Sequence, residues 1–387
     1  MKKILALLLA VVMILGLAAC GGKSDADFKV GFICLHDEKS TYDLNFINAV
    51  EEVKKSLGLK DEQIIIMTNI PEGDECYQAA ADLVDQGCDV IFANSFGHED
   101  FMIKAAKEFP EVQFCHATGT KAHTEGLANY HNAFASIYQG RYLAGIAAGM
   151  KLNEMIDAGT IKADEAKMGY VGAFTYAEVI SGYTSFYLGA KSVCPTVTMD
   201  VQFTGSWYDP TEEKNAAEAL IARGCDLISQ HADSMGAPST CEAAKVPNVS
   251  YNGSTKDACP NTFIVSSRIN WAPYYEYMIK CVQEKKAIDT DWCGGIEQGS
   301  VVLTEINEAV AAKGTADKIK EVTEGLKNGT VNVFDTKNFT VGNATLTTHK
   351  VEDKEVIENG IFNESKIMSA PYFDLRIDGI VLLNEKY

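Results

Sequence analysis

The sequence has little positive charge and, beyond Leu17, no long hydrophobic run. Its 34 Lys and Arg are outnumbered by 53 Asp and Glu, which gives a formal net charge of −19. Such a surface repels nucleic acids and anionic lipids, so we expect no nucleic-acid partner. No later segment reaches the length of about 18 consecutive apolar residues that indicates a membrane span. Because 47% of the residues are hydrophobic, the chain also lacks the composition that is typical of disordered proteins. We expect a soluble, globular body.

The sequence also lacks the motifs of common catalytic and metal sites. It contains no G-x-S-x-G, G-x-G-x-x-G or G-x-x-x-x-G-K-[ST] motif. His116, His123 and His131 share no helical face and are joined by no HExxH motif, so we expect no metal and no cofactor. Acidic pairs such as Glu212-Glu213 lie in polar helical patterns that are typical of solvated surfaces.

Cysteines are too sparse for a disulfide scaffold, at 11 in 387 residues. Many lie inside apolar runs, where a thiol packs as a small hydrophobic group. We therefore expect most of the cysteines after Cys20 to be free and buried. Two pairings, Cys241 with Cys259 and Cys281 with Cys293, stay open as alternatives.

The N-terminus has the pattern of a secretion signal. Two lysines precede the apolar run from Ile4 to Leu15, which is shorter than the roughly 20 residues of a membrane-spanning helix. The following Leu17-Ala-Ala-Cys20-Gly21 resembles a bacterial lipobox, which implies lipidation of Cys20. We therefore expect a signal peptide at residues 1–19, a linker at 20–27 and an extracytoplasmic protein anchored to the membrane by lipid.

The remaining chain alternates short apolar runs with amphipathic stretches, which predicts doubly wound α/β lobes with parallel sheets. Expected strands include 29–35, 63–68, 89–94, 112–117, 168–172, 197–203, 225–229, 249–251 and 262–266. Expected helices lie near 43–57, 75–86, 99–108, 136–152, 177–193, 211–223, 237–244 and 272–286. The same order of elements occurs twice, so we expect two similar lobes. The last 100 or so residues read as mixed strands and loops.

Several stretches together resemble the basic membrane protein family of ABC-transporter substrate-binding lipoproteins, which includes purine nucleoside receptors. Besides the lipobox, they are Ser40-Thr-Tyr-Asp43, Asn132-Ala-Phe134, Tyr138 to Gly149, Gly169-Tyr-Val-Gly172 and Gly205-Ser-Trp-Tyr-Asp209. The resemblance implies a type I periplasmic-binding-protein fold, with a hinge between two lobes and a ligand cleft between them. We expect residues 28–154 plus about 262–290 in the N-terminal lobe, and 155–261 plus about 291–387 in the C-terminal lobe.

The resemblance and the loops at the predicted strand ends give a set of candidate ligand-binding residues. They are Tyr42, Asp43, Ser95, Phe96, Trp207, Asp233, Asn252 and Trp271. The set is rich in aromatic rings and hydrogen-bond acceptors and contains no cation, which suits a flat, neutral heterocycle. Trp207 and Trp271 have core packing as their alternative role, and Asp233 has helix capping. Asn252 stands where the family's ribose-binding acid is expected, which favours fewer sugar contacts.

These features predict a receptor without enzymatic activity that passes a purine nucleoside or nucleobase to the permease and ATPase of an ABC importer. Two alternatives remain from the sequence. One is a receptor for another planar compound, such as a flavin, and the other is an exported enzyme that acts on nucleosides.

Overall fold

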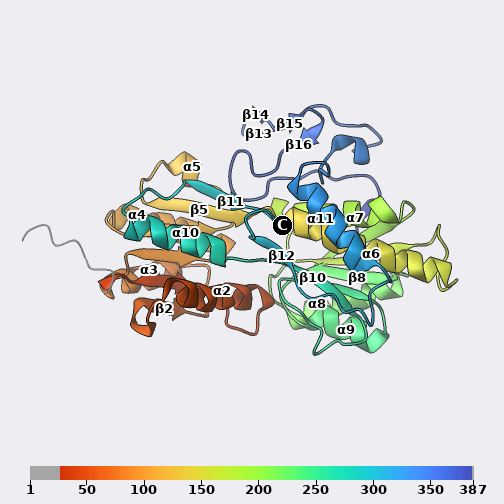
Figure 1. The fold of residues 1–387 in the computed structure, drawn as a ribbon, viewed down its shortest axis with the longest axis horizontal. Helices are drawn as coiled ribbons and strands as arrows, with labels where there is room; N and C mark the ends of the chain where they lie inside the picture. The colour runs from red at the N-terminus through yellow and green to blue at the C-terminus, as the bar shows by residue number, and fades with distance from the viewer. Residues whose placement is uncertain (1–26, 386–387) are drawn as a thin grey trace, which may run out of the picture.

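The computed structural model describes residues 27–385 and shows two α/β lobes side by side (Figure 1). The signal peptide, most of the linker and Cys20 lie outside the described residues. Each lobe has a mainly parallel sheet that is covered by helices on both faces. The prediction of two doubly wound lobes is therefore confirmed.

The first lobe contains six parallel strands in the order β11-β5-β4-β3-β1-β2. Side chains alternate across this sheet, so that Phe32 and Phe92 pack with helices α2 and α10 while Ile33 and Ile91 pack with α3 and α4. The strands are β1 (Val30–Ile33), β2 (Ile64–Met67), β3 (Val90–Ala93), β4 (Gln113–Ala117), β5 (Tyr130–Ala135) and β11 (Asp291–Gly294). The helices are α2 (Thr41–Leu57), α3 (Asp74–Asp85), α4 (Glu99–Glu108), α5 (Ala122–Glu125) and α10 (Ala272–Gln283), with 3-10 turns η2 (Asp61–Gln63) and η3 (Phe96–His98).

The second lobe contains seven strands in the order β12-β10-β9-β8-β6-β7-β17, of which β12 is antiparallel to its neighbour. Tyr170 and Leu227 pack with helices α6 and α7, whereas Val171 and Ile228 pack with α8 and α9. The strands are β6 (Lys167–Gly172), β7 (Thr198–Phe203), β8 (Leu227–His231), β9 (Asn248–Tyr251), β10 (Phe263–Ile269), β12 (Val301–Leu303) and β17 (Ile380–Leu382). The helices are α6 (Ile137–Asp157), α7 (Ala177–Val193), α8 (Pro210–Ala222) and α9 (Gly236–Ala244).

Helices α6 and α7 approach each other closely because glycines lie at their contact. A Cβ atom on Gly145 would lie 2.0 Å from the carbonyl oxygen of Phe186, and one on Gly189 would lie 2.0 Å from that of Tyr142. Only glycine permits backbones to come this near. The Ala- and Gly-rich stretch that carries part of the family resemblance therefore fixes α6 against the second lobe.

The chain passes between the lobes after β5, β10 and β11, and the sheet pairing differs from the predicted division. Strand β10, expected in the N-terminal lobe within residues 262–290, pairs with β9 in the second sheet. Strand β11, expected in the C-terminal lobe, pairs with β5 in the first sheet. Helix α6 begins beside the first lobe but packs on α7 and β10. Apolar runs identify strands, but long-range pairing decides to which sheet each one belongs.

The C-terminal part contains a helix that the sequence analysis missed. Helix α11 (Thr315–Lys327) buries Ile319 and Val322 beside α6. After the 3-10 turn η4 (Thr336–Asn338), two small hairpins follow, formed by β13 (Lys350–Val351), β14 (Lys354–Glu355), β15 (Ile357–Glu358) and β16 (Ile361–Phe362). This segment also reaches the first lobe, because Oε2 of Glu352 in the segment lies 3.0 Å from Nε2 of His123 in the first lobe. It therefore contacts both lobes (Figure 1).

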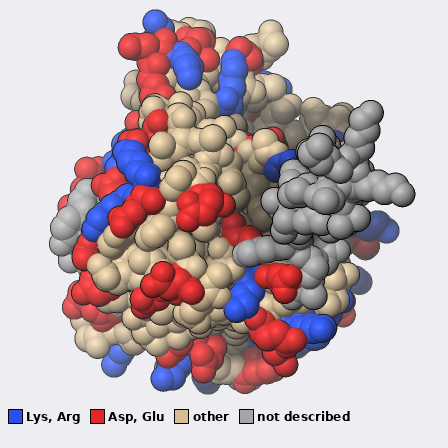
Figure 2. Space-filling model, turned by 90° about the vertical axis from the view of Figure 1, so that its left-hand side faces the viewer, with Lys and Arg blue, Asp and Glu red and all other residues tan. Residues whose placement is uncertain are grey.

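The ten cysteines among the described residues are free and nine of them are buried, so neither alternative pairing occurs. Among residues 27–385, no helix combines the length and the apolar character that crossing a bilayer requires. Figure 2 shows one face of the molecule, where basic side chains are scattered among acidic ones and form no continuous patch. This distribution agrees with the formal net charge of −19.

Candidate functional site

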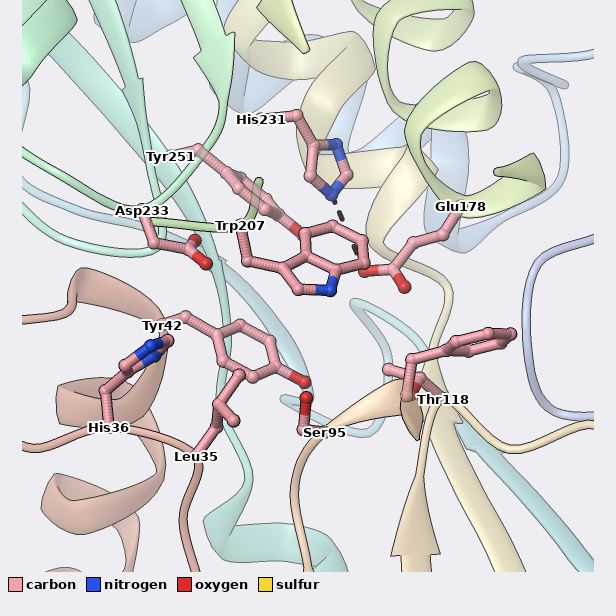
Figure 3. Close-up of a pocket in the computed structure, with 11 residues that line it drawn as sticks. Leu35, His36, Tyr42, Ser95, Thr118, Glu178, Trp207, His231, Asp233 and Tyr251 are labelled. Atoms are coloured by element: carbon pink, nitrogen blue, oxygen red, sulfur yellow. Dashed lines mark ion pairs between the residues drawn. The ribbon is translucent and has the colours of Figure 1, made fainter. Parts of the chain in front are cut away.

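A cavity lies between the lobes (Figure 3). It sits where the strands of both sheets end, the usual ligand site of open α/β sheets. We call it the interlobe cavity. From the first lobe it is lined by Leu35, His36, Tyr42, Ser95, Phe96 and Thr118, and from the second by Glu178, Trp207, His231, Asp233 and Tyr251.

The first lobe contributes a fixed aromatic wall. The ring of Tyr42, in the first turn of α2, packs edge-on against Phe46 at a centroid distance of 4.8 Å. Its hydroxyl donates a hydrogen bond to the carbonyl oxygen of Asn94, directly after β3. Phe96 follows in η3 and is 37% exposed, so its ring is available for contact. Tyr42 is therefore held rigidly, while Phe96 forms the more open edge.

The second lobe contributes a cluster of rings opposite this wall. Trp207, after β7, packs edge-on against Phe174 with ring centroids 5.0 Å apart. Phe174 in turn stacks on Tyr176, also at 5.0 Å. Tyr176 contacts Phe96 of the first lobe at 5.2 Å, so aromatic contact crosses the gap between the lobes. Rings on both sides suit a flat ligand that is enclosed by stacking.

The polar groups of the cavity are chiefly acidic. The carboxylate of Glu178, in the first turn of α7, lies 3.5 Å from His231 Nε2, and the carboxyl of Asp233 points toward the same space (Figure 3). Burial raises the pKa of Asp233 well above its usual value, and the charges of Glu213, Asp43 and Glu178 raise it further. A raised pKa favours the protonated form of Asp233, and a protonated carboxyl can donate as well as accept a hydrogen bond. No Lys or Arg from the described part of the chain lines the cavity.

The structure brings five of the eight predicted ligand-binding residues together around the interlobe cavity. These are Tyr42, Ser95, Phe96, Trp207 and Asp233. Asp233 is not the N-cap of α9, which is Met235, so its alternative role as a helix cap does not hold. Trp207 lines the cavity and also packs on Phe174, so both roles proposed for it are present.

Asp43 lies outside the cavity lining, contrary to the prediction. Its side chain is fully buried, and its carboxylate accepts hydrogen bonds from the backbone N–H of His36 at 3.1 Å and from Asn94 Nδ2 at 2.7 Å. It thus connects the loops that follow β1 and β3. Consecutive helical residues point about 100° apart, so Tyr42 and Asp43 could not both face the ligand space.

Trp271 and Asn252 are also not part of the lining. Trp271 is 1% exposed and stacks on Phe46 at 4.5 Å within the core of the first lobe. Asn252 is buried directly after β9, with a positive φ of 62° and its N–H donating to the carbonyl oxygen of Ser267. Both residues therefore hold the framework around the strand ends.

Six lining residues were absent from the predicted set, namely Leu35, His36, Thr118, Glu178, His231 and Tyr251. Five of them end a strand or follow it within three residues, so a rule based on strand ends would have found them. The strand-end rule would not have found Glu178. It lies in the first turn of α7, where an acidic residue is usually explained by its favourable interaction with the helix dipole.

Comparisons with known proteins identify the family of the chain. The family model for PnrA-like ABC transporter substrate-binding proteins matches residues 35–337. A purine-binding protein of Brucella abortus is 32% identical over 81% of this chain and 85% of its own length. A putative ABC transporter glucose-binding protein of Haloferax volcanii is 33% identical over 64% of this chain and 59% of its own length.

The fold is also shared with solved structures. An ABC transporter solute-binding protein from Conexibacter woesei matches with a TM-score of 0.64 and 18% identity, covering 79% of this chain and 98% of its own. This likeness confirms the type I periplasmic-binding-protein fold that the family resemblance implies. The chain belongs to the PnrA-like family of ABC transporter substrate-binding proteins.

Proposed function

We propose that the interlobe cavity binds a purine base or purine nucleoside. The observation that carries this proposal is the combination of aromatic rings from both lobes with carboxyl groups and without cations. Rings stack on the faces of a purine, while Glu178 and Asp233 accept hydrogen bonds from its N–H groups. The missing cations disfavour a phosphorylated ligand.

The purine-binding relative supports this ligand class, whereas the glucose-binding relative points to a sugar at nearly equal identity. The two matches differ in extent, since the purine-binding relative aligns over 81% of the chain and the other over 64%. A hexose carries hydroxyls around its whole rim and requires many donors and acceptors. The interlobe cavity instead has rings from both lobes and its two carboxyl groups on the second lobe, which matches a base better.

The decisive experiment identifies the ligand that purified protein carries and then measures its affinity. Mass spectrometry of the released ligand should find a purine, and calorimetry should show binding of purine bases or nucleosides but not of glucose or flavin mononucleotide. Glucose or a flavin as the bound compound would overturn the proposal. Incubation with nucleosides should yield no product, and catalytic turnover would favour the enzyme alternative.

The proposal includes delivery of the ligand to the permease and ATPase of an ABC importer from a lipid anchor at Cys20. The lipobox-like sequence that ends at Cys20 supports the anchor. Several acyl chains on one residue hold a protein stably at a membrane, whereas one chain holds it only marginally. Cys20→Ala should therefore leave the protein unprocessed or release it from the membrane. Unchanged partitioning into the detergent phase would contradict the anchor.

A further inference from the structure

A buried arginine lies behind the cavity without an acidic partner. Arg141, in α6, is fully buried, and its guanidinium donates to the hydroxyls of Tyr170 at 3.0 Å and Ser229 at 2.9 Å. Within residues 27–385 it forms no ion pair. Its central carbon lies 5.1 Å from the ring centroid of Tyr251, which lines the cavity. Arginine keeps its proton in proteins, so a positive charge is fixed behind the cavity wall.

The hydrogen bonds of Arg141 and the position of Glu178 favour one tautomer of His231. A guanidinium only donates, so the hydroxyl oxygen of Tyr170 accepts from Arg141 and its own proton is free to be donated. That hydroxyl lies 3.4 Å from His231 Nδ1, and we assign Nδ1 as the acceptor because a hydrogen on Nε2 then faces the Glu178 carboxylate at 3.5 Å. Burial lowers the pKa of His231, with the Glu178 carboxylate opposing and Arg141 reinforcing this shift. The ring is neutral, and its hydrogen lies on Nε2.

His231 Nε2 and the Glu178 carboxylate then form a pattern of one donor beside two acceptors. Nε2 and the nearer carboxylate oxygen lie 3.5 Å apart, and Nε2 points toward the carboxylate and the cavity (Figure 3). Nε2 is buried and has no hydrogen-bond partner. No other side chain or backbone group of the described residues forms a hydrogen bond with the Glu178 carboxylate. A ligand edge with one acceptor and two donors would satisfy both groups.

We infer that Glu178 and His231 select the 2-amino-6-oxo edge of a guanine ring, with Arg141 and Tyr170 as positioning residues that keep His231 a donor. O6 would accept from Nε2–H, while N1–H and the 2-amino group would donate to the two carboxylate oxygens. Adenine offers a single donor on this edge and leaves one charged oxygen unpaired. Xanthine turns an oxygen at C2 toward the carboxylate. The inference rests on the proposed purine-binding function and adds a preference within that class.

The test uses Glu178→Gln, which keeps the shape of the side chain but replaces one of its two acceptor oxygens with an NH2 donor. The glutamine amide accepts from N1–H but donates at the second position, so it should reject the 2-amino group of guanine and accept the C2 oxygen of xanthine. Guanine, hypoxanthine, xanthine and adenine, with their nucleosides, are titrated by calorimetry at mildly acidic pH, where xanthine is neutral. Glu212→Gln, at an exposed position in the first turn of α8, is the matched control.

A bidentate pair discriminates between bases by roughly 5- to 150-fold. Wild-type protein and Glu212→Gln should therefore bind guanine at least about fivefold more tightly than adenine or xanthine. Glu178→Gln should reverse the order of guanine and xanthine. If no purine binds wild-type protein, the proposed function itself fails. If purines bind but adenine binds best, or if Glu178→Gln leaves the guanine-to-xanthine ratio unchanged, only the edge selection fails.

Tyr170→Phe tests the positioning role separately, because it removes the donor to Nδ1 and leaves Glu178 in place. We expect a several-fold loss of preference for 6-oxopurines over adenine and a smaller change in the ratio of guanine to xanthine. The nitrogen NMR spectrum of His231 should show hydrogen on Nε2 in wild-type protein and a mixture of tautomers in the variant. Equal weakening of all purines with an unchanged spectrum would assign Tyr170 a purely structural role.

Discussion

Two tryptophans that the sequence presents alike should respond oppositely to truncation. Trp207 lines the interlobe cavity and contacts Phe174 edge-on, whereas Trp271 is 1% exposed and stacks on Phe46 in the core of the first lobe. Stacking of a base on an aromatic side chain contributes about 1–3 kcal/mol. Because about 1.4 kcal/mol is a factor of ten, Trp207→Ala should weaken purine binding by roughly 5- to 150-fold.

The stability of the unliganded protein separates the two roles. Trp207→Ala loses an edge-to-face contact of about 0.5–1.5 kcal/mol, which corresponds to a fall in melting temperature of roughly 1–6 °C. Trp271→Ala opens a cavity in a packed core, at a cost of about 3–5 kcal/mol or roughly 6–20 °C. Where the Trp271 variant still folds, its affinity for the ligand should stay within a few-fold of the parent.

Calorimetry and thermal unfolding on the same samples give both quantities. Trp207→Phe serves as the conservative control and should retain most of the affinity, because a flat ring remains in place. The reasoning would be refuted by a Trp207→Ala variant that binds like the parent but melts many degrees lower. In that case Trp207 is a packing residue, and the ligand binds elsewhere.

Three further predictions concern residues around the cavity and in the C-terminal segment. Asp43→Ala should lower the melting temperature by several degrees, because Asn94 and a loop N–H lose a charged acceptor. Burial raises the pKa of Asp43, but hydrogen bonds to its carboxylate outweigh this effect and keep the pKa below 3.8. The stabilisation by Asp43 is therefore present above pH 3.8 and is lost as the pH falls further. A difference in stability between parent and variant that does not depend on pH in thermal melts would contradict this. Thr41→Val should weaken ligand binding by roughly fivefold without lowering the unliganded melting temperature, because its hydroxyl donates to the backbone oxygen of Asp233 in the opposite lobe. Burial raises the pKa of Glu364 from 4.5 to about 8, so between these pH values the folded state retains a proton that the unfolded state loses. The stability of the protein should therefore fall as the pH rises from 4.5 to about 8. In thermal melts of Glu364→Gln, the decrease in stability that is due to Glu364 should be absent.

The sequence was sufficient for most of the strands and helices up to α10 and for the general position of the site. The apolar run 89–94 became β3 (Val90–Ala93), and the helix expected at 177–193 has the same bounds in the structure. Such local patterns specify a strand or a helix but not its neighbours. The assignment of β10 and β11 to the wrong lobes shows this limit, since sheet membership depends on pairing with strands far away in the chain. Helix α11 was missed because the last 100 or so residues were interpreted as mixed strands and loops, although Ile319, Val322 and Leu326 follow the i, i+3, i+7 spacing of an amphipathic helix.

For the candidate site, the sequence predicted where residues lie along the chain but not the direction in which their side chains point. Loops at strand ends correctly placed Trp207 and Asp233 at the cavity. Asp43 follows β1 by ten residues and Trp271 follows β10 by two, but the first turn of α2 and the N-cap of α10 direct them into the interior. One position along a helix therefore decides whether a side chain faces ligand or core. Glu178 could be recognised only once His231 was seen beside it.

The contacts between the lobes indicate how ligand binding is converted into a change of shape. Across the cavity, the N–H and hydroxyl of Thr41 share the backbone oxygen of Asp233, at 3.2 and 3.1 Å, and Phe96 meets Tyr176 at 5.2 Å. Each such contact contributes only about 0.5–1.5 kcal/mol. Moving a two-state equilibrium from mostly open to mostly closed requires about 5.5 kcal/mol of differential binding. These contacts across the cavity supply less than this, and we expect a ligand between Tyr42 and Trp207 to contribute to closure. Because the backbone of Asp233 joins the lobes while its carboxyl faces the ligand, ligand recognition and lobe closure depend on the same loop.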